Sequence, residues 1–392
     1  THKYTHCSHS YLHSHGYHTY VCTHAITYTD LNRSRPWLTK GLAVLMGIIL
    51  VAELIEGGIS EIAFPGQPAG QIQIQKNFTA ITETVSDAQS SNIMIGPNTA
   101  FLIKYGAKFG PCMREDIAYK ATRAISWERE ESLGLGCCTV TALNQCGMAS
   151  QTECLSVTSA TWDSAKCSSS CSGASTIVRP CCYLDGRCEV TRTEFCTKTG
   201  GVPSVAGQTC ATAKCLSQIC GLSGVPNENA DQWYRFITPI FLHAGVLHYI
   251  GNMMLQLSLG VQIERVAGTL RTALIYFIAG IGGYLTSGVF SPNIPSVGAS
   301  AASFGLLGIS VVDLFQSWQL VKDPWKRLFW TTIETCIYLG LGLLPFVDNW
   351  AHVGGFVFGI LAAIVFLPYL TFGLLDSLRK RCFMIFCIPT LM

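Results

Sequence analysis

Two polar residues within apolar stretches, Ser300 and His352, have the chemistry needed for acyl transfer. A serine hydroxyl is a weak nucleophile until a base within hydrogen-bond reach takes its proton. Each residue lies a few positions inside the same end of its hydrophobic segment, so we expect both at a similar depth in a membrane. The sequence therefore predicts a Ser-His dyad, with Ser300 as the nucleophile and His352 as the general base.

Donors for a tetrahedral oxyanion are predicted on another hydrophobic segment. His248 and Asn252 are four residues apart and so share one face of a helix. Together with the Ser300 backbone N–H, they would stabilise the negative charge that develops during attack. Asp348 lies one turn before His352, where it suits a helix N-cap better than a triad carboxylate.

Each of these features also has a purely structural interpretation. Runs of Gly, Ala and Ser form ordinary packing surfaces between membrane helices, and a single histidine can bond across helices. Ionisable residues within apolar segments are costly, however, and tend to mark function. Three separated segments place such residues at one end of the predicted bundle, which favours the dyad. Small residues at Ala351, Gly355 and Gly359 would let the His352 segment approach the Ser300 segment closely.

The composition is that of a membrane protein. Only 13% of the 392 residues are charged and 49% are hydrophobic, whereas soluble domains are roughly 25% charged. Residues 382–392 are apolar but too few to cross a bilayer, and they predict a partial seventh helix. Hydrophobic runs predict an all-α bundle of six membrane helices at 38–57, 246–263, 272–290, 297–315, 329–347 and 350–370.

Basic residues alternate between the connections of these helices. Lys and Arg occur before the first helix and after the second, fourth and sixth, whereas the short loops after the third and fifth have none. The positive-inside rule then places the N-terminus in the cytosol and residues 58–230 in the lumen or outside the cell. Asn77 would be a usable glycosylation site and Asn32 would not. We expect a multi-pass protein of the endoplasmic reticulum, the Golgi or the plasma membrane.

The cysteines are concentrated between the first two predicted helices. Of the 19 cysteines, 14 lie between Cys112 and Cys220. Zinc sites need repeated C-x2-C pairs with histidines, and this segment has neither. We therefore predict seven disulfides of undetermined pairing, and we predict no metal and no cofactor. Disulfides need an oxidising compartment, in agreement with the orientation derived from charge.

The first 37 residues differ in composition from the rest. Seven of the ten histidines occur in the first 30 residues at irregular spacing, which indicates a disordered low-complexity tail. A net charge of +2 provides no basic surface for nucleic acid. The predicted organisation is a cytosolic tail (1–37), a first membrane helix (38–57), a Cys-rich domain (58–230), a five-helix catalytic core (231–370) and a basic turn with the partial seventh helix (371–392).

The polar residues and their spacing resemble the rhomboid family of intramembrane serine proteases. That family has HxxxN, GxSx and AHxxGxxxG in three helices, and this chain matches them at 248–252, 298–301 and 351–359. The resemblance implies a rhomboid-type bundle with Ser300 as nucleophile, His352 as base, and His248 and Asn252 as oxyanion donors. It also implies supporting roles for Phe304, on which the imidazole would stack, for Gly298, Gly355 and Gly359, and for Trp233 and Arg235 in the preceding loop.

Residues from about 135 to 392 resemble the inactive rhomboids of animals more closely still. Those proteins also carry a large Cys-rich domain between the first two membrane helices. They lack the serine and have proline before its position, whereas this chain has Ala299-Ser300. Active rhomboids usually have glycine after the serine. Here Ala301 follows it, and its methyl either crowds the oxyanion site or packs against a neighbour.

Two functions are compatible with this pattern, and both have single-pass membrane proteins and the lipid bilayer as partners. A serine endopeptidase would cleave such proteins within or beside their transmembrane helix through an acyl-enzyme. A non-catalytic adaptor, like the inactive rhomboids, would control the trafficking or degradation of membrane clients. The Ser-His pair favours the endopeptidase. A transporter or channel is disfavoured, because the sequence has no inverted repeat and no ring of intramembrane charge.

Overall fold

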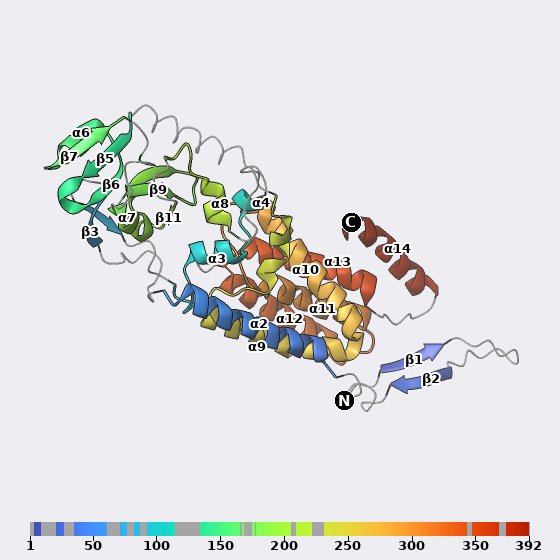
Figure 1. Ribbon diagram of the computed structural model, residues 1–392. Helices are drawn as coiled ribbons and strands as arrows, with labels where there is room; N and C mark the ends of the chain where they lie inside the picture. Colours follow the sequence, from blue (N-terminus) through green and yellow to red (C-terminus); the bar gives the residue numbers. More distant parts are fainter. Residues whose placement is uncertain are drawn as a thin grey trace, which may run out of the picture. The chain divides into compact units, whose positions relative to one another are not determined.

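The chain divides into two units, which are described separately (Figure 1). The first comprises residues 1–48, 250–287 and 299–392, and the second comprises residues 49–249 and 288–298. The boundaries 58–230 and 231–370 stay a prediction. The computed structural model describes residues 4–8, 21–26, 35–60, 71–76, 82–86, 92–113, 134–164, 167, 175–176, 178–204, 209–221, 231–342, 347–367 and 374–391.

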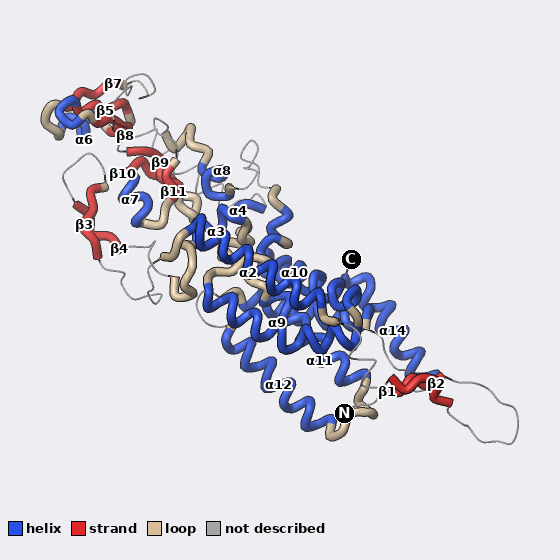
Figure 2. Tube along the Cα trace, turned by 60° about the horizontal axis from the view of Figure 1, so that its bottom comes forward, coloured by secondary structure: helices blue, strands red, loops and turns tan. Residues whose placement is uncertain are grey.

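Helices occupy all six predicted membrane segments, and Figure 2 shows those of the first unit side by side. The fourth starts three residues later than predicted, because Gly298 has a φ of 131°. The fifth starts five residues earlier, with Pro324 in its first turn. The helices are α2 (Trp37–Gly57), α9 (Val246–Ala267), α10 (Thr269–Phe290), α11 (Ser300–Gln316), α12 (Pro324–Leu341), α13 (Asn349–Phe366) and α14 (Leu374–Leu391). Helix α14 contains the predicted partial seventh helix and also the basic residues that were expected to form a turn before it.

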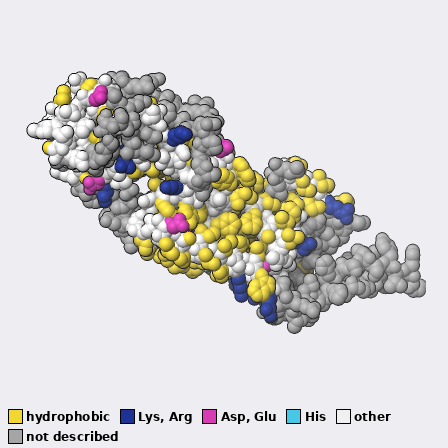
Figure 3. Space-filling view, viewed as in Figure 1, with side chains coloured by type: hydrophobic (Ala, Val, Ile, Leu, Met, Phe, Trp, Pro, Cys, Tyr) yellow, Lys and Arg dark blue, Asp and Glu magenta, His cyan; other side chains and the backbone are white. Residues whose placement is uncertain are grey.

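Three described helices, α2, α10 and α13, are both long and apolar enough to cross a membrane. The apolar helix α11 is shorter, with 17 residues. Hydrophobic side chains cover much of the helical surface (Figure 3), and Ile48, Met254 and Phe329 are among the exposed ones. Exposed apolar surface of this extent is expected where lipid replaces water, so the helical bundle is that of a membrane protein.

Glu264 fixes the start of α2 within the first unit. This carboxylate is completely buried and accepts hydrogen bonds from the backbone N–H groups of Leu38 (3.0 Å) and Thr39 (2.9 Å). It also accepts from the hydroxyls of Thr39 (2.8 Å) and Thr269 (2.9 Å). Backbone N–H groups in the first turn of a helix have no partner within that helix, so the carboxylate serves as an N-cap supplied by another helix.

Part of the N-terminal tail, expected to be disordered, forms the antiparallel strands β1 (Tyr4–Ser8) and β2 (Val21–Ile26). Their Thr, Tyr and Val residues favour strands, which explains the difference. The second unit contains most of the remaining short elements. Its strands are β3 (Gln71–Gln75), β4 (Thr82–Ser86), β5 (Gly136–Val140), β6 (Gln145–Ala149), β7 (Ala160–Asp163), β8 (Ser175–Thr176), β9 (Val178–Cys182), β10 (Cys188–Arg192) and β11 (Val202–Pro203).

These strands form a β3-β4 hairpin, a three-stranded sheet in the order β10-β9-β11 and a four-stranded sheet in the order β7-β5-β6-β8. All the pairs are antiparallel except β6 with β8. The helices and turns of the second unit are α3 (Thr99–Tyr105), α4 (Gly110–Met113), η1 (Thr141–Leu143), α6 (Gln151–Leu155), α7 (Thr193–Lys198), α8 (Cys215–Cys220), η3 (Trp233–Phe236) and η4 (Thr238–Ile240).

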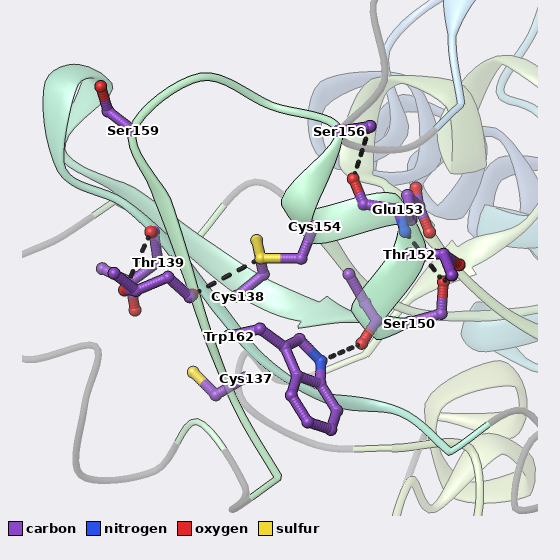
Figure 4. Close-up of a disulfide and its surroundings, with 12 residues drawn as sticks. Cys137, Cys138, Thr139, Ser150, Thr152, Glu153, Cys154, Ser156, Ser159 and Trp162 are labelled. Atoms are coloured by element: carbon purple, nitrogen blue, oxygen red, sulfur yellow. Dashed lines mark hydrogen bonds between the residues drawn. A yellow bond between two sulfur atoms is a disulfide. The ribbon is translucent and has the colours of Figure 1, made fainter.

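Disulfides hold these small sheets together, as predicted. Figure 4 shows the surroundings of Cys138–Cys154, where the Trp162 indole donates to the Ala149 carbonyl (3.0 Å). Cys146 is also disulfide-bonded, and its partner lies outside the described residues. The six described bridges are Cys112–Cys220, Cys137–Cys167, Cys138–Cys154, Cys181–Cys196, Cys182–Cys215 and Cys188–Cys210.

Within the described part of the chain, one group of side chains has the spacing of a metal site, and it consists of Cys182, Cys188 and Cys215. All three sulfurs belong to disulfides. Because the thiolate is the form of cysteine that binds a metal, this group is a disulfide cluster and no metal centre.

Candidate active site

Ser300 is the first residue of α11. The chain reaches it through Gly298, whose left-handed φ of 131° suits only glycine, and the Gly298 N–H donates to the Pro239 carbonyl (2.8 Å). Ser300 is half-buried, whereas Ala299 and Ala301 on either side are fully buried. Its hydroxyl therefore lies at a helix N-terminus, where the helix dipole stabilises developing negative charge.

His352 lies one turn into α13. Asp348 caps this helix by accepting from the Ala351 N–H (3.2 Å), and it also accepts from the Ser287 hydroxyl in α10. The N-cap interpretation of Asp348 is confirmed. The imidazole of His352 is buried and stacks on the ring of Phe304, with 4.3 Å between centroids and 17° between planes.

The stacking relates His352 to Ser300. Phe304 is four residues after Ser300 in α11, so the two share one face of that helix. The imidazole that covers Phe304 therefore lies beside the face that carries the hydroxyl. Among the described residues, the hydrogen bonds do not include one between Ser300 Oγ and His352. Such bonds are often long or misaligned in serine-histidine sites without substrate.

Glycines bring α11 and α13 into backbone contact. A β-carbon at Gly355 would collide with the Ala301 carbonyl oxygen and would lie 2.8 Å from its carbonyl carbon. One turn further along, a β-carbon at Gly359 would collide with the Gly305 backbone. Small residues allow such close approach in membrane bundles. These contacts fix the position of His352 relative to α11.

The methyl of Ala301 packs against another helix. A β-carbon placed at Gly283 in α10 would lie 2.8 Å from Ala301 Cβ, so the methyl fills space that this glycine leaves free. Ala301 is completely buried. Ala301 therefore packs against α10, and the effect of its methyl on the oxyanion site stays a prediction.

The two predicted oxyanion residues are both on α9. Asn252 is buried and belongs to the first unit, while His248 is half-buried and belongs to the second. His248 Nδ1 accepts from the Ala244 backbone N–H (3.2 Å). A ring nitrogen that accepts carries no proton, so the proton of the neutral ring is on Nε2, where it can be donated. The oxyanion roles of both residues stay a prediction.

Arg235 has a structural position in the second unit. Its side chain is completely buried and donates to the carbonyls of Ile103 (2.7 Å) and Ala107 (2.6 Å) and to Gln232 Oε1 (2.6 Å). It also donates to the Cys220 carbonyl. The burial lowers the pKa of Arg235 to about 10, and the guanidinium remains charged at neutral pH.

Trp233 differs from Arg235, its neighbour in the same loop. Its side chain is 66% exposed and makes an edge contact with the Tyr234 ring. The supporting role implied for Trp233 stays a prediction.

Replacing Arg235 with Met is expected to destabilise the protein by about 3 kcal/mol, because three buried carbonyl groups lose their donor. Thermal unfolding in detergent measures this change. Arg187→Met is the matched control. Arg187 pairs with Asp185 at 2.6 Å, but both side chains are more than half exposed. The control should change the unfolding free energy by less than about 1 kcal/mol. Equal effects of the two variants would contradict a special role for Arg235.

Two further buried carboxylates were not recognised in the sequence as structural groups. One is Glu264, which caps α2. The other is Glu53 in α2, which is completely buried and accepts from the His243 backbone N–H at 3.3 Å to each oxygen. Isolated acidic residues in a hydrophobic run give no signal of their partner when that partner is a backbone group more than 180 residues away.

The fold and these residues define a polytopic α-helical membrane protein with a disulfide-bonded Cys-rich region. Residues 230–369 match the rhomboid domain. The chain is 31% identical to inactive rhomboid protein 1 of Rattus norvegicus over 410 residues, which cover 90% of this chain and 47% of the relative. It is 31% identical to inactive rhomboid protein 2 of Homo sapiens over 407 residues, which cover 88% and 47%. The chain belongs to the rhomboid family, and it spans about half the length of these curated relatives.

Proposed function

We propose that this chain is an intramembrane serine endopeptidase that cleaves single-pass membrane proteins within or beside their transmembrane helix. One observation carries the proposal. The His352 imidazole stacks on Phe304, one turn after Ser300 on the same helix. A buried base held beside the face of a helix that begins with serine supports nucleophilic catalysis by this pair.

In the proposed reaction, Ser300 Oγ attacks the scissile carbonyl while His352 takes the hydroxyl proton. The resulting oxyanion accepts hydrogen bonds from His248 Nε2–H, from the Asn252 amide and from the Ser300 backbone N–H. Collapse of this intermediate breaks the C–N bond. His352 gives its proton to the leaving amine, and an acyl-enzyme remains on Ser300. Water, deprotonated by His352, then attacks the ester and releases the second product.

The proposed topology has a cytosolic N-terminus and a Cys-rich region that faces the lumen or the cell exterior, in a membrane of the secretory pathway. The disulfides support it, because they form in oxidising compartments. Asn77 is the glycosylation site predicted in that region, and it lies outside the described residues. Glycosylation tests the topology. A glycosidase-sensitive change in gel mobility that depends on Asn77 would support this orientation, and one that depends on Asn32 would support the opposite orientation.

The purified protein, reconstituted in liposomes with a panel of single-span membrane proteins, tests the proposal. Products that appear with the wild type and disappear with Ser300→Ala support the endopeptidase. Mass spectrometry of the products locates the cut, which is expected within or beside the transmembrane helix.

A second candidate function is supported by the comparisons. Relatives that match about nine-tenths of this chain are named inactive rhomboid proteins. The corresponding proposal is a non-catalytic adaptor that binds membrane clients and controls their trafficking or degradation. Co-purification of transmembrane clients without any cleavage, unchanged in Ser300→Ala, would favour the adaptor over the endopeptidase.

A further inference from the structure

Helix α9, which carries His248, obtains its N-terminal cap from a distant part of the chain. The N–H groups of Val246 and Leu247 donate to the carbonyls of Ile95 (3.0 Å) and Met94 (3.1 Å). The first N–H groups of a helix have no partner within it, and a side chain just before the helix usually provides one. Here Gly245 precedes α9 with a φ of 157° and has no side chain to offer. The cap therefore comes from the segment 92–97.

Asn92 joins this segment to the turn before α9. Its Oδ1 accepts from the Met94 N–H (2.9 Å), and its Nδ2 donates to the carbonyls of Pro97 (2.8 Å) and Ala244 (2.7 Å). An amide nitrogen has two hydrogens, and both are used. Only an amide can accept from one backbone group and donate to two others in this way, so an isosteric carboxylate cannot replace it.

The contact between the two segments is tight. A β-carbon at Gly96 would lie 2.6 Å from Gly245 Cα, and one at Gly245 would lie 2.6 Å from the Ile95 carbonyl. Ile95 has a φ of 56°. Left-handed backbone is disfavoured for a β-branched residue and persists only where its surroundings hold it. The strained residue is the one whose carbonyl caps Val246, and strain of this kind concentrates at functional positions.

The turn that Asn92 holds also determines which nitrogen of His248 carries the proton. Ala244 accepts from Asn92 through its carbonyl and donates through its N–H to His248 Nδ1 (3.2 Å). The Glu53 carboxylate accepts from the N–H of the preceding residue, His243. The turn 243–245 is thus held on both sides. In this position the neutral His248 ring has its proton on Nε2, as an oxyanion donor requires.

We infer that Asn92 is a positioning residue: by holding the Ala244 turn and the cap of α9, it orients the His248 imidazole and keeps its proton on Nε2. The role in catalysis rests on the proposed endopeptidase function. Asn92 lies outside the rhomboid domain at 230–369. The turn beside His248 is therefore held by a segment that the matched domain does not contain.

Asn92→Asp tests the inference. Aspartate keeps an oxygen that can accept from the Met94 N–H, and it replaces the NH2 group with a second oxygen, which repels the carbonyls of Pro97 and Ala244. Asn98→Asp is the matched control. Among the described residues, the Asn98 side chain bonds through Oδ1 alone, which accepts from the Phe101 N–H (2.8 Å) as the N-cap of α3. Aspartate preserves that bond. Asn92→Ser provides a neutral second variant should the aspartate prevent folding. It removes the amide with its two donated hydrogens, and its shorter hydroxyl carries a single hydrogen.

Two readouts do not depend on catalysis. Hydrogen exchange of the Val246 and Leu247 amides should be at least about 10-fold faster in Asn92→Asp and Asn92→Ser than in the wild type and Asn98→Asp. The 15N shifts of His248, assigned with a His248→Gln sample, should report a protonated Nε2 in the wild type and loss of that preference in both Asn92 variants. Unchanged exchange and an unchanged tautomer in either folded Asn92 variant would overturn the inference.

The kinetic readout separates the inference from the proposed function. If the wild type cleaves substrate, Asn92→Asp should lower kcat by roughly 10- to 100-fold with little change in KM, and Asn98→Asp should change neither. An unchanged kcat would overturn the catalytic role. If the wild type cleaves nothing while exchange and tautomer respond as expected, the endopeptidase proposal fails and the positioning of His248 by Asn92 stands.

Discussion

Ser300→Ala and His352→Ala are each expected to lower the rate of substrate cleavage by about 10⁴-fold or more while leaving the fold intact. Ser300, the proposed nucleophile, is the first residue of α11. His352 is the proposed base, and its ring stacks on Phe304. Because the two residues act as one unit, the double variant should be no slower than either single variant. Cleavage of a single-span substrate in liposomes measures all three rates.

Ser303→Ala is the control for this pair. Ser303 lies three residues after Ser300 in α11, and its buried hydroxyl has no hydrogen-bond partner among the described residues. Loss of an unsatisfied buried hydroxyl should not destabilise the protein. Cleavage by Ser303→Ala should match that of the wild type. If Ser300→Ala retained wild-type cleavage, another residue would be the nucleophile, and the dyad would be wrong.

Gly355→Ala is expected to destabilise the protein by about 2–3 kcal/mol, although alanine is intrinsically better than glycine within a helix. The added methyl would collide with the Ala301 carbonyl oxygen and would lie 3.0 Å from Ala301 Cα, so α11 and α13 must separate. The separation would move the His352 ring relative to Phe304 and Ser300. We therefore expect cleavage to fall by roughly 100-fold in the molecules that remain folded.

The control for Gly355 is Gly340→Ala in α12, where a β-carbon would have no atom within 4 Å. The helix propensity of alanine should then stabilise the protein by up to about 1 kcal/mol. Thermal unfolding of both variants in the same detergent measures the difference. A neutral or stabilising Gly355→Ala would contradict the close contact between α11 and α13.

Local patterns in the sequence were sufficient to predict the six membrane helices, although not all of their ends. Hydrophobic runs indicate α2 and α9 to α13. The HxxxN and AHxxG motifs identify the polar residues of α9 and α13, and Asp348 directly precedes α13, as is typical of an N-cap. Three features could not be predicted, because they depend on residues far apart in the chain. These are the pairing of the cysteines, the capping of α2 by Glu264, and the capping of α9 by the segment 92–97. The cysteines are identical side chains, and most of the capped or capping groups are backbone atoms, so none of these pairings has a distinctive sequence pattern.

The bridge between Cys112 and Cys220 has a consequence for how this protein can vary in evolution. Its two Cα atoms are 5.6 Å apart although 108 positions separate them. The chain between them therefore forms a closed loop whose two ends are adjacent. One end, Cys220, is also bound by Arg235, which donates a hydrogen bond to its carbonyl. Insertions and deletions within that loop do not change the distance between its ends. The length of this loop can thus vary while its two ends, Cys112 and Cys220, stay joined beside Arg235.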